Sequence, residues 1–159
     1  ASDVYKRQLI DLTLATQERF PRRITVNITP FVPKAHTPFQ WVGMAPVEVL
    51  KERVSRIEQA LRPKGVAVKA ESPAWAAVQG VLSRGDRRVG QALVRVRGKS
   101  LAVWHRALRE CGLDAAEYLR DRSPDEPLPW VVVGCGVSHD YLEREMKRAL
   151  KLKRETSDR

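Results

Sequence analysis

Residues 24–29 read Ile-Thr-Val-Asn-Ile-Thr, in which apolar and polar side chains alternate and β-branched residues predominate. This pattern is typical of a half-buried β-strand. A second short strand is expected over 66–70, and a helix over about 46–62 lies between the two strands, with apolar residues every three or four positions. Another helix is expected over 9–20. The order helix, strand, helix, strand predicts an α/β fold with crossover connections.

The second half of the chain is predicted to be helical. Side chains that commonly cap helices precede apolar stripes at several places after residue 71. These capping residues are Ser72, Asp86, Ser100, Asp114 and Ser138. We therefore expect a helical extension over 71–150, followed by a charged tail over 151–159.

Composition limits the class of protein. The 159 residues are 43% apolar and 30% charged, which favours a packed core over intrinsic disorder. The formal net charge of +10 suits an anionic partner. No apolar run approaches the roughly 20 residues that span a bilayer, so no membrane partner is expected. Two cysteines, Cys111 and Cys135, cannot form a disulfide framework, which indicates a reducing, cytoplasmic location.

The first eight residues differ in character from the rest. The chain begins with Ala, and residues 3–8 look like the in-frame translation of a transposon-end adapter used in sequencing libraries. We expect residues 1–8 to be an artefact of that kind and leave them out of the fold prediction. The remainder is then expected to be the C-terminal part of a longer protein, with the missing N-terminal part as its partner.

A loop rich in distinctive side chains follows the first predicted strand. Residues 31–41 read Phe-Val-Pro-Lys-Ala-His-Thr-Pro-Phe-Gln-Trp. This stretch, called here the signature loop, resembles the F-V-P-K-x-x-T-P-F-Q-W signature of a group of radical S-adenosylmethionine (radical SAM) proteins, several of which are fused to cobalamin-binding domains. Later features agree with the group in order, namely residues 83–88 (Ser-Arg-Gly-Asp-Arg-Arg), Trp104, residues 128–130 (Leu-Pro-Trp), Gly136-Val137 and Leu142-x-x-Glu145.

The resemblance implies a fold and cofactors. Radical SAM enzymes use a partial (β/α) barrel, in which a C-x-x-x-C-x-x-C loop binds a [4Fe–4S] cluster and the open iron holds S-adenosylmethionine. In that fold, 9–70 would form the last elements of the barrel, and 71–150 would follow as an α-helical extension. The signature loop would lie at the C-terminal end of the last strand, where barrel chemistry takes place. The cysteine triad itself is absent, because Cys111 and Cys135 share no motif. No residue here is expected to bind a metal.

The resemblance also assigns candidate site residues. The residues that it implies to bind a cofactor or the substrate are Phe31, Val32, Pro33, Lys34, His36, Gln40 and Trp41. By their chemistry, Lys34 offers a point charge to a carboxylate or phosphate, and His36 offers a proton or a ligand nitrogen. Gln40 and Trp41 add an amide and a stacking ring. The alternative is a loop whose polar residues are solvated or cap helices, with Trp41 packed against the next helix.

Three arginines form a second candidate site. Arg84, Arg87 and Arg88 surround a predicted helix start, where guanidinium groups and free backbone N–H groups suit a phosphate or an RNA backbone. The alternative is that Asp86 caps the helix while the arginines pair with acidic residues. Cys135 lies between two glycines and is expected to be a small buried residue rather than a reactive thiol.

The leading hypothesis is therefore that the chain is the C-terminal portion of a radical SAM enzyme that acts on an unknown substrate. Its catalytic residues are not identified from the sequence. Cobalamin binding is considered for the full-length protein only. Alone, the chain is expected to be inactive. The alternative is a small basic module that binds RNA or another polyanion without catalysis, although no RNA-binding motif is present.

Overall fold

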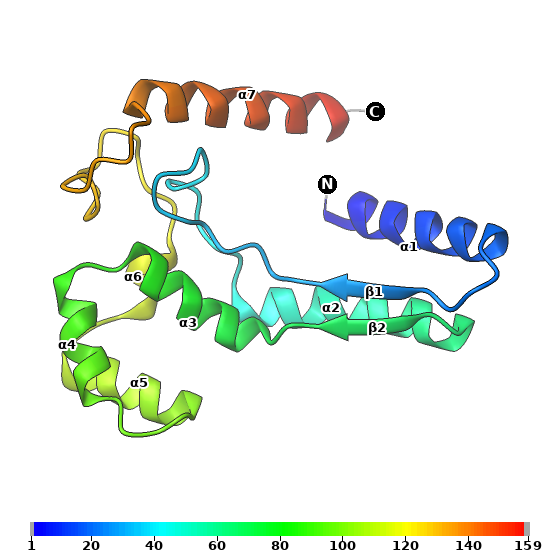
Figure 1. Cartoon of the computed structure of the whole chain (residues 1–159), viewed down its shortest axis with the longest axis horizontal. Helices are drawn as coiled ribbons and strands as arrows, with labels where there is room; N and C mark the ends of the chain where they lie inside the picture. The colour runs from blue at the N-terminus through cyan, green and yellow to red at the C-terminus, as the bar shows by residue number, and fades with distance from the viewer. Residues whose placement is uncertain (1, 158–159) are drawn as a thin grey trace. The chain divides into compact units, whose positions relative to one another are not determined.

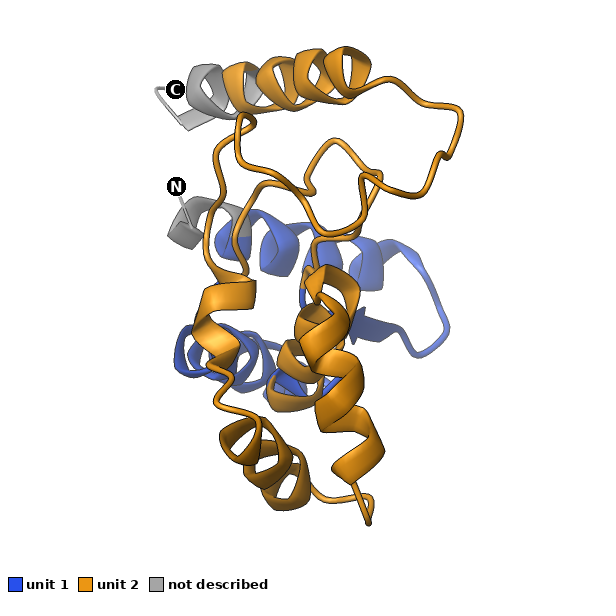
Figure 2. Ribbon diagram, turned by 90° about the vertical axis from the view of Figure 1, so that its left-hand side faces the viewer, with its two compact units in different colours: residues 1–30, 45–73 blue, residues 31–44, 74–159 orange. Residues whose placement is uncertain are grey.

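A computed structural model describes the backbone of residues 2–157 and the side chains of residues 6–151. The chain divides into two compact units, which Figure 2 distinguishes by colour. Unit 1 comprises residues 1–30 and 45–73, and unit 2 comprises residues 31–44 and 74–159.

Unit 1 contains a strand–helix–strand arrangement preceded by a helix (Figure 1). Its elements are α1 (Ser2–Arg19), β1 (Thr25–Ile28), α2 (Val47–Leu61), a 3-10 turn (Arg62–Lys64) and β2 (Ala67–Ala70). The two strands are parallel, with Thr25 opposite Ala67 and Ile28 opposite Ala70. Because parallel strands need a long crossover, α2 returns the chain to the starting end of the sheet. The predicted order of helix, strand, helix and strand is confirmed.

The core of unit 1 explains why these elements pack together. Ile57 and Leu61 lie on the apolar stripe of α2 and are buried together with Val66. Apolar residues of α1, including Leu9 and Leu14, pack against this cluster. Among residues 2–157 the sheet has two strands, and the barrel implied by the resemblance stays a prediction.

Unit 2 carries the remaining helices. They are α3 (Pro73–Arg84), α4 (Arg87–Arg95), α5 (Leu101–Glu110), α6 (Ala115–Leu119) and α7 (His139–Ser157). The predicted capping side chains Asp86, Ser100, Asp114 and Ser138 accept hydrogen bonds from backbone N–H groups in the first turns of α4, α5, α6 and α7. These caps satisfy N–H groups that a helix start leaves without an intrahelical acceptor.

Two apolar clusters support unit 2. The first joins α3, α4, α5 and α6 and includes Val81, Val89, Trp104, Leu108 and Tyr118. The second joins the signature loop, residues 128–130 and α7, and consists of Trp41, Leu128, Trp130, Leu142 and Met146. The second cluster positions the candidate site.

The observed units differ from the predicted division at residue 70. The segment 31–44, which precedes α2 in the chain, belongs to unit 2. The physical reason is backbone pairing: Trp41 O accepts from the N–H of Arg122 at 2.8 Å, and the N–H of Met44 donates to Leu119 O at 2.8 Å. The signature loop is therefore structurally part of the helical extension.

The chain ends also differ from the predicted element boundaries. Helix α1 begins at Ser2, so residues 2–8 continue the helix that was expected to begin at Leu9. Their adapter origin stays a prediction, and residue 1 lies outside the described residues. Helix α7 extends to Ser157 and takes in most of the predicted charged tail, while residues 158–159 lie outside the described part.

Candidate functional site

The side chain of Gln40 connects two sequence motifs that lie far apart in the chain. Gln40 is buried, and its Oε1 accepts from the backbone N–H of His36 at 3.0 Å and from Trp130 Nε1 at 2.7 Å. The second bond spans 90 residues. A buried amide that makes these bonds avoids the cost of unsatisfied polar groups. Gln40 thus holds the signature loop against the Leu-Pro-Trp segment.

His36 adopts an unusual backbone conformation. Its φ of 57° lies in the left-handed region, and among the described non-glycine residues it alone has a positive φ. This conformation is costly for residues with a Cβ, although His tolerates it better than most. The bond from His36 N–H to Gln40 Oε1, together with Thr37 Oγ1 donating to Lys34 O at 2.8 Å, holds the turn. Strain of this kind is often kept at functional sites.

A cavity of about 400 Å³ lies beside this turn and is walled by His36, Gln40 and Trp130. Cys135 and His139 also line it. The remaining walls are mostly apolar and come from Leu128, Val131, Val133, Val137 and Leu142, with Gly134, Gly136 and Ser138. Apolar walls with a few polar groups are typical of small-molecule sites.

Cys135 and His139 were not predicted as parts of a site. The prediction that Cys135 is buried was wrong, because its side chain is exposed at the cavity. Cys135 precedes Gly136, whose φ of 76° lies in the left-handed region, and belongs to no helix or strand. His139 Nε2 lies 3.1 Å from Pro124 O, and the imidazole contacts the Trp41 ring edge to face at 5.1 Å between centroids.

The other predicted loop residues serve different structural roles. Lys34 Nζ donates to Ser83 Oγ at 3.1 Å, which joins the signature loop to the segment 83–88. Trp41 and Pro33 are buried, and Trp41 belongs to the second cluster of unit 2. Trp41 thus packs as the alternative expected, but the buried residues of its cluster come from 128–130 and α7 and not from the next helix, α2. Phe31 is exposed and meets Phe39 edge to face at 5.7 Å. Val32 is half-buried.

The three predicted anion-binding arginines do not converge on one surface. Arg84 is fully buried, whereas Arg87 is exposed. Arg88 pairs with Asp86 at 2.7 Å, and Tyr118 OH donates to Asp86 Oδ1 at 3.3 Å. Hydrogen bonds from Arg88 lower the pKa of Asp86, and burial raises the pKa of Tyr118. Arg88 and Asp86 thus follow the cap-and-pair alternative.

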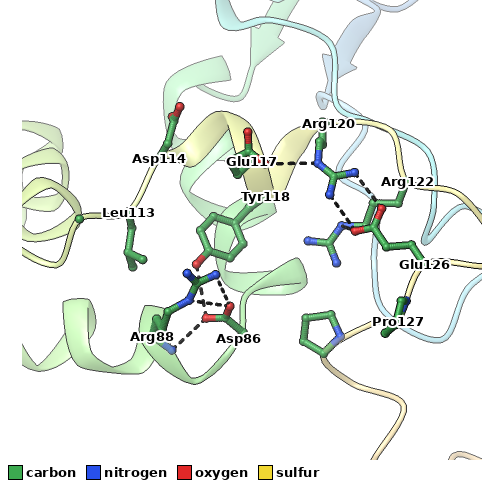
Figure 3. A pocket seen from close by; sticks show the side chains of 12 residues that line it. Asp86, Arg88, Leu113, Asp114, Glu117, Tyr118, Arg120, Arg122, Glu126 and Pro127 are labelled. Carbon is green, nitrogen blue, oxygen red and sulfur yellow. Dashed lines mark hydrogen bonds and ion pairs between the residues drawn. The ribbon is translucent and has the colours of Figure 1, made fainter.

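A second cavity, of about 300 Å³, is more polar than the first (Figure 3). Figure 3 shows two ion-paired groups along its wall: Arg88 with Asp86, and Arg120 with Glu126. Both oxygens of Glu126 accept from Arg120, at 2.8 and 2.9 Å. These bonds lower the pKa of Glu126. Arg122 also lines this cavity, and no sequence motif marked it in advance.

The described residues do not fit an iron–sulfur cluster. Three thiolates normally hold a [4Fe–4S] cluster in the radical SAM group, and this chain has two cysteines. Cys111 is half-buried, and its Sγ accepts from Arg95 Nη1 at 3.1 Å, whereas Cys135 is exposed. Within the described range, no group of three His, Cys, Asp or Glu side chains is placed to hold a metal ion.

None of the helices described here combines the length and the apolar composition that a membrane crossing requires.

The sequence was compared with curated proteins, protein-family models and solved structures. An uncharacterized protein of Methanocaldococcus jannaschii is 30% identical over 90 residues, which cover 54% of this chain and 19% of that protein. No protein-family model matches the sequence. No solved structure matches it either. The chain is thus similar to part of a longer protein, and the match spans 19% of that relative's length.

Proposed function

We propose that this chain is the substrate-binding C-terminal portion of a radical SAM enzyme, and that the cavity beside the signature loop binds a small organic substrate. The observation that carries the proposal is the contact of Gln40 Oε1 with both His36 and Trp130 at the edge of that cavity. Through it, the two motifs that resemble the radical SAM group meet at one site. The match to a short part of a longer protein agrees with a fragment.

Each wall residue has a distinct task in this proposal. The apolar side chains, with Trp130 among them, exclude water and contact the carbon skeleton of the substrate. His36 presents an imidazole that can donate or accept a hydrogen bond, and it can exchange a proton near neutral pH. Gln40 is a positioning residue, because it acts by fixing the His36 turn.

The [4Fe–4S] cluster and S-adenosylmethionine belong, in this proposal, to the part of the longer polypeptide that precedes the chain. A cobalamin-binding domain, where one is fused as in several members of the group that the chain resembles, would also lie in that upstream part. The first test is therefore to read the coding sequence upstream. A C-x-x-x-C-x-x-C motif ahead of residue 9 supports the proposal, and a start codon just upstream without that motif contradicts it.

The biochemical test uses the upstream-extended polypeptide under anaerobic conditions with iron and sulfide. We expect cluster absorbance and, after dithionite, release of 5′-deoxyadenosine. The chain of 159 residues should give neither. Cluster formation by the short chain alone would contradict the fragment assignment.

The site itself is tested by variants of the extended polypeptide. His36→Gly keeps the left-handed turn accessible while it removes the imidazole. We expect this variant to lower turnover with unchanged cluster content. His105→Ala, at an exposed histidine on α5, is the matched control. Turnover that is indifferent to His36→Gly would refute the site but not the fragment assignment.

A second candidate function is polyanion binding, favoured by the net charge of +10. Of the three arginines first considered, Arg87 and Arg88 are exposed, and Arg88 is paired with Asp86. This candidate rests on overall charge rather than on a formed site.

A further inference from the structure

Two arginine side chains in unit 2 are buried without enough hydrogen-bond acceptors. Arg84 is fully buried, and none of its three guanidinium nitrogens has an acceptor among the described residues. Arg122 has a side chain that is 6% exposed, and its Nε also lacks a hydrogen-bond acceptor within the described part. A guanidinium carries five N–H donors and keeps its charge in proteins. Such groups are normally paired when buried.

The neighbouring carboxylates are already occupied. Glu126 Oε1 lies 3.9 Å from Arg122 Nε, too far for a hydrogen bond, and both Glu126 oxygens accept from Arg120. Asp121 Oδ1 accepts from the backbone N–H of Gly43 at 2.7 Å. The charges of Asp121 and Glu126 favour the Arg84 cation, but neither carboxylate hydrogen-bonds to it.

The Arg122 guanidinium also lies against the backbone of Arg84. Arg122 Nη2 donates to the backbone carbonyl of Arg84 at 3.3 Å. The Arg122 guanidinium lies over the Trp130 ring, 5.4 Å from its centroid, which keeps the side chain in place. Burial, with the nearby charge of Arg122, lowers the pKa of Arg84 to about 10. Of these two causes, the charge of Arg122 indicates a local excess of positive charge.

Arg122 connects this excess to an open space. Its side chain lines the cavity of about 300 Å³ shown in Figure 3, next to Arg120 and Pro127. A ligand in that cavity reaches Arg122 directly, whereas Arg84 is not among the residues that line the cavity, so Arg84 can act on the ligand only through its charge. Planar guanidinium groups recognise carboxylate and phosphate oxygens through paired hydrogen bonds.

We propose that Arg122, with the charge of Arg84 nearby, binds an oxyanion, which is the phosphate or carboxylate group of a small ligand in the cavity that Arg122 lines. The oxyanion supplies a hydrogen-bond acceptor for Arg122, and its negative charge adds to that of Asp121 and Glu126. The proposal does not depend on radical SAM chemistry, because it rests on contacts within unit 2 alone.

The experiment uses the chain of 159 residues in chloride buffer at constant ionic strength. Inorganic phosphate and acetate are titrated separately, and the melting temperature and the binding heat are recorded. We expect a saturable rise in melting temperature with at least one of the two anions, as ligand linkage requires. A response to phosphate alone assigns a phosphate group, and a response to acetate alone assigns a carboxylate.

Variants separate this site from general charge effects. Arg122→Met should abolish the saturable response, and Arg84→Met should weaken it. Arg84→Met should melt no lower than the wild type in chloride buffer, because it removes a buried charge without hydrogen-bond acceptors. Arg87→Met, which removes an exposed arginine of the same segment, should keep the full response.

The proposal is overturned if neither anion gives a saturable response in the wild type, or if Arg87→Met weakens the response as much as Arg84→Met. If Arg84→Met does not fold, Arg122→Met decides: a saturable response that survives in Arg122→Met also overturns the proposal.

Discussion

At the scale of single residues, one oxygen atom organises the first cavity. Gln40 Oε1 accepts two N–H donors, one from the backbone of His36 and one from the indole of Trp130. Both donors would lose their acceptor if the amide were removed, and Gln40 is only 3% exposed, so water replaces it poorly.

Gln40→Leu should therefore destabilise the protein through two unsatisfied donors rather than through lost volume. We expect a loss of about 2 kcal/mol or more in the free energy of unfolding, measured by urea denaturation. Gln91→Leu, at an exposed position on α4, should change it by less than about 0.5 kcal/mol. Equal effects of the two substitutions would show that the Gln40 bonds contribute little.

At the scale of elements, unit 2 depends on the close approach of two segments that lie far apart in the chain. Residues 41–44 pair through their backbone with residues 119–122. Gly43 allows this approach, because a Cβ there would lie 2.8 Å from the backbone nitrogen of Asp121 and 3.0 Å from Leu119 O. These are backbone atoms and cannot move aside as a flexible side chain can.

Gly43→Ala should therefore cost about 1–3 kcal/mol of unfolding free energy, because it forces the two segments apart. Gly90→Ala in α4 is the matched control, since a Cβ there meets nothing within 4 Å. The control should stabilise the protein by about 0.5–1 kcal/mol through its better helix propensity. Thermal and urea unfolding of both variants test the contrast, and a stabilised Gly43→Ala would disprove the close approach.

The cap of α4 gives a prediction that depends on pH. Hydrogen bonds from Arg88 lower the pKa of Asp86 below its ordinary value of 3.8. Because the pKa is lower in the folded state, the ionised carboxylate stabilises the fold above pH 3.8, and this stabilisation is lost as the pH falls through the folded pKa.

Asp86→Ala should cost about 1 kcal/mol at pH 7, as expected for a lost N-cap. The difference between wild type and variant should shrink as the pH falls below 3.8. Urea unfolding between pH 7 and pH 2.5 measures it, with Asp86→Asn as a control that keeps a capping oxygen. A difference independent of pH would mean that the charge of Asp86 plays no part.

At the scale of the whole molecule, the main property is the net charge of +10. Charge of this size attracts polyanions without a formed site, and the attraction weakens steeply with salt. We therefore expect weak binding of single-stranded RNA at low salt.

If the binding reflects overall charge, Arg87→Glu and Arg106→Glu should reduce the salt dependence of RNA binding equally. Both side chains are exposed, on α4 and α5 respectively, and both substitutions change the charge by the same amount. Fluorescence anisotropy with a labelled oligouridine, measured over a salt series, tests this. A clearly larger effect of Arg87→Glu would favour the dedicated polyanion-binding function over the enzyme proposal.

The sequence by itself determined the secondary structure of most of the chain. The apolar stripe of α2, the alternation in β1 and the capping side chain of α4, Asp86, are local patterns. They depend on neighbours no more than a few residues away, so periodicity and capping rules detect them. The parallel pairing of β1 with β2 also follows, because a helix connects the two strands.

Only the tertiary structure decided how the motifs combine into sites. The segment around Arg84 has the composition of an exposed basic patch, yet Arg84 is buried beside Arg122. Likewise, Gln40 meets Trp130 across 90 residues, and Cys135 faces a cavity rather than the core. Burial and long-range contacts depend on which segments pack together. A local sequence pattern does not identify a packing partner that lies far away in the chain.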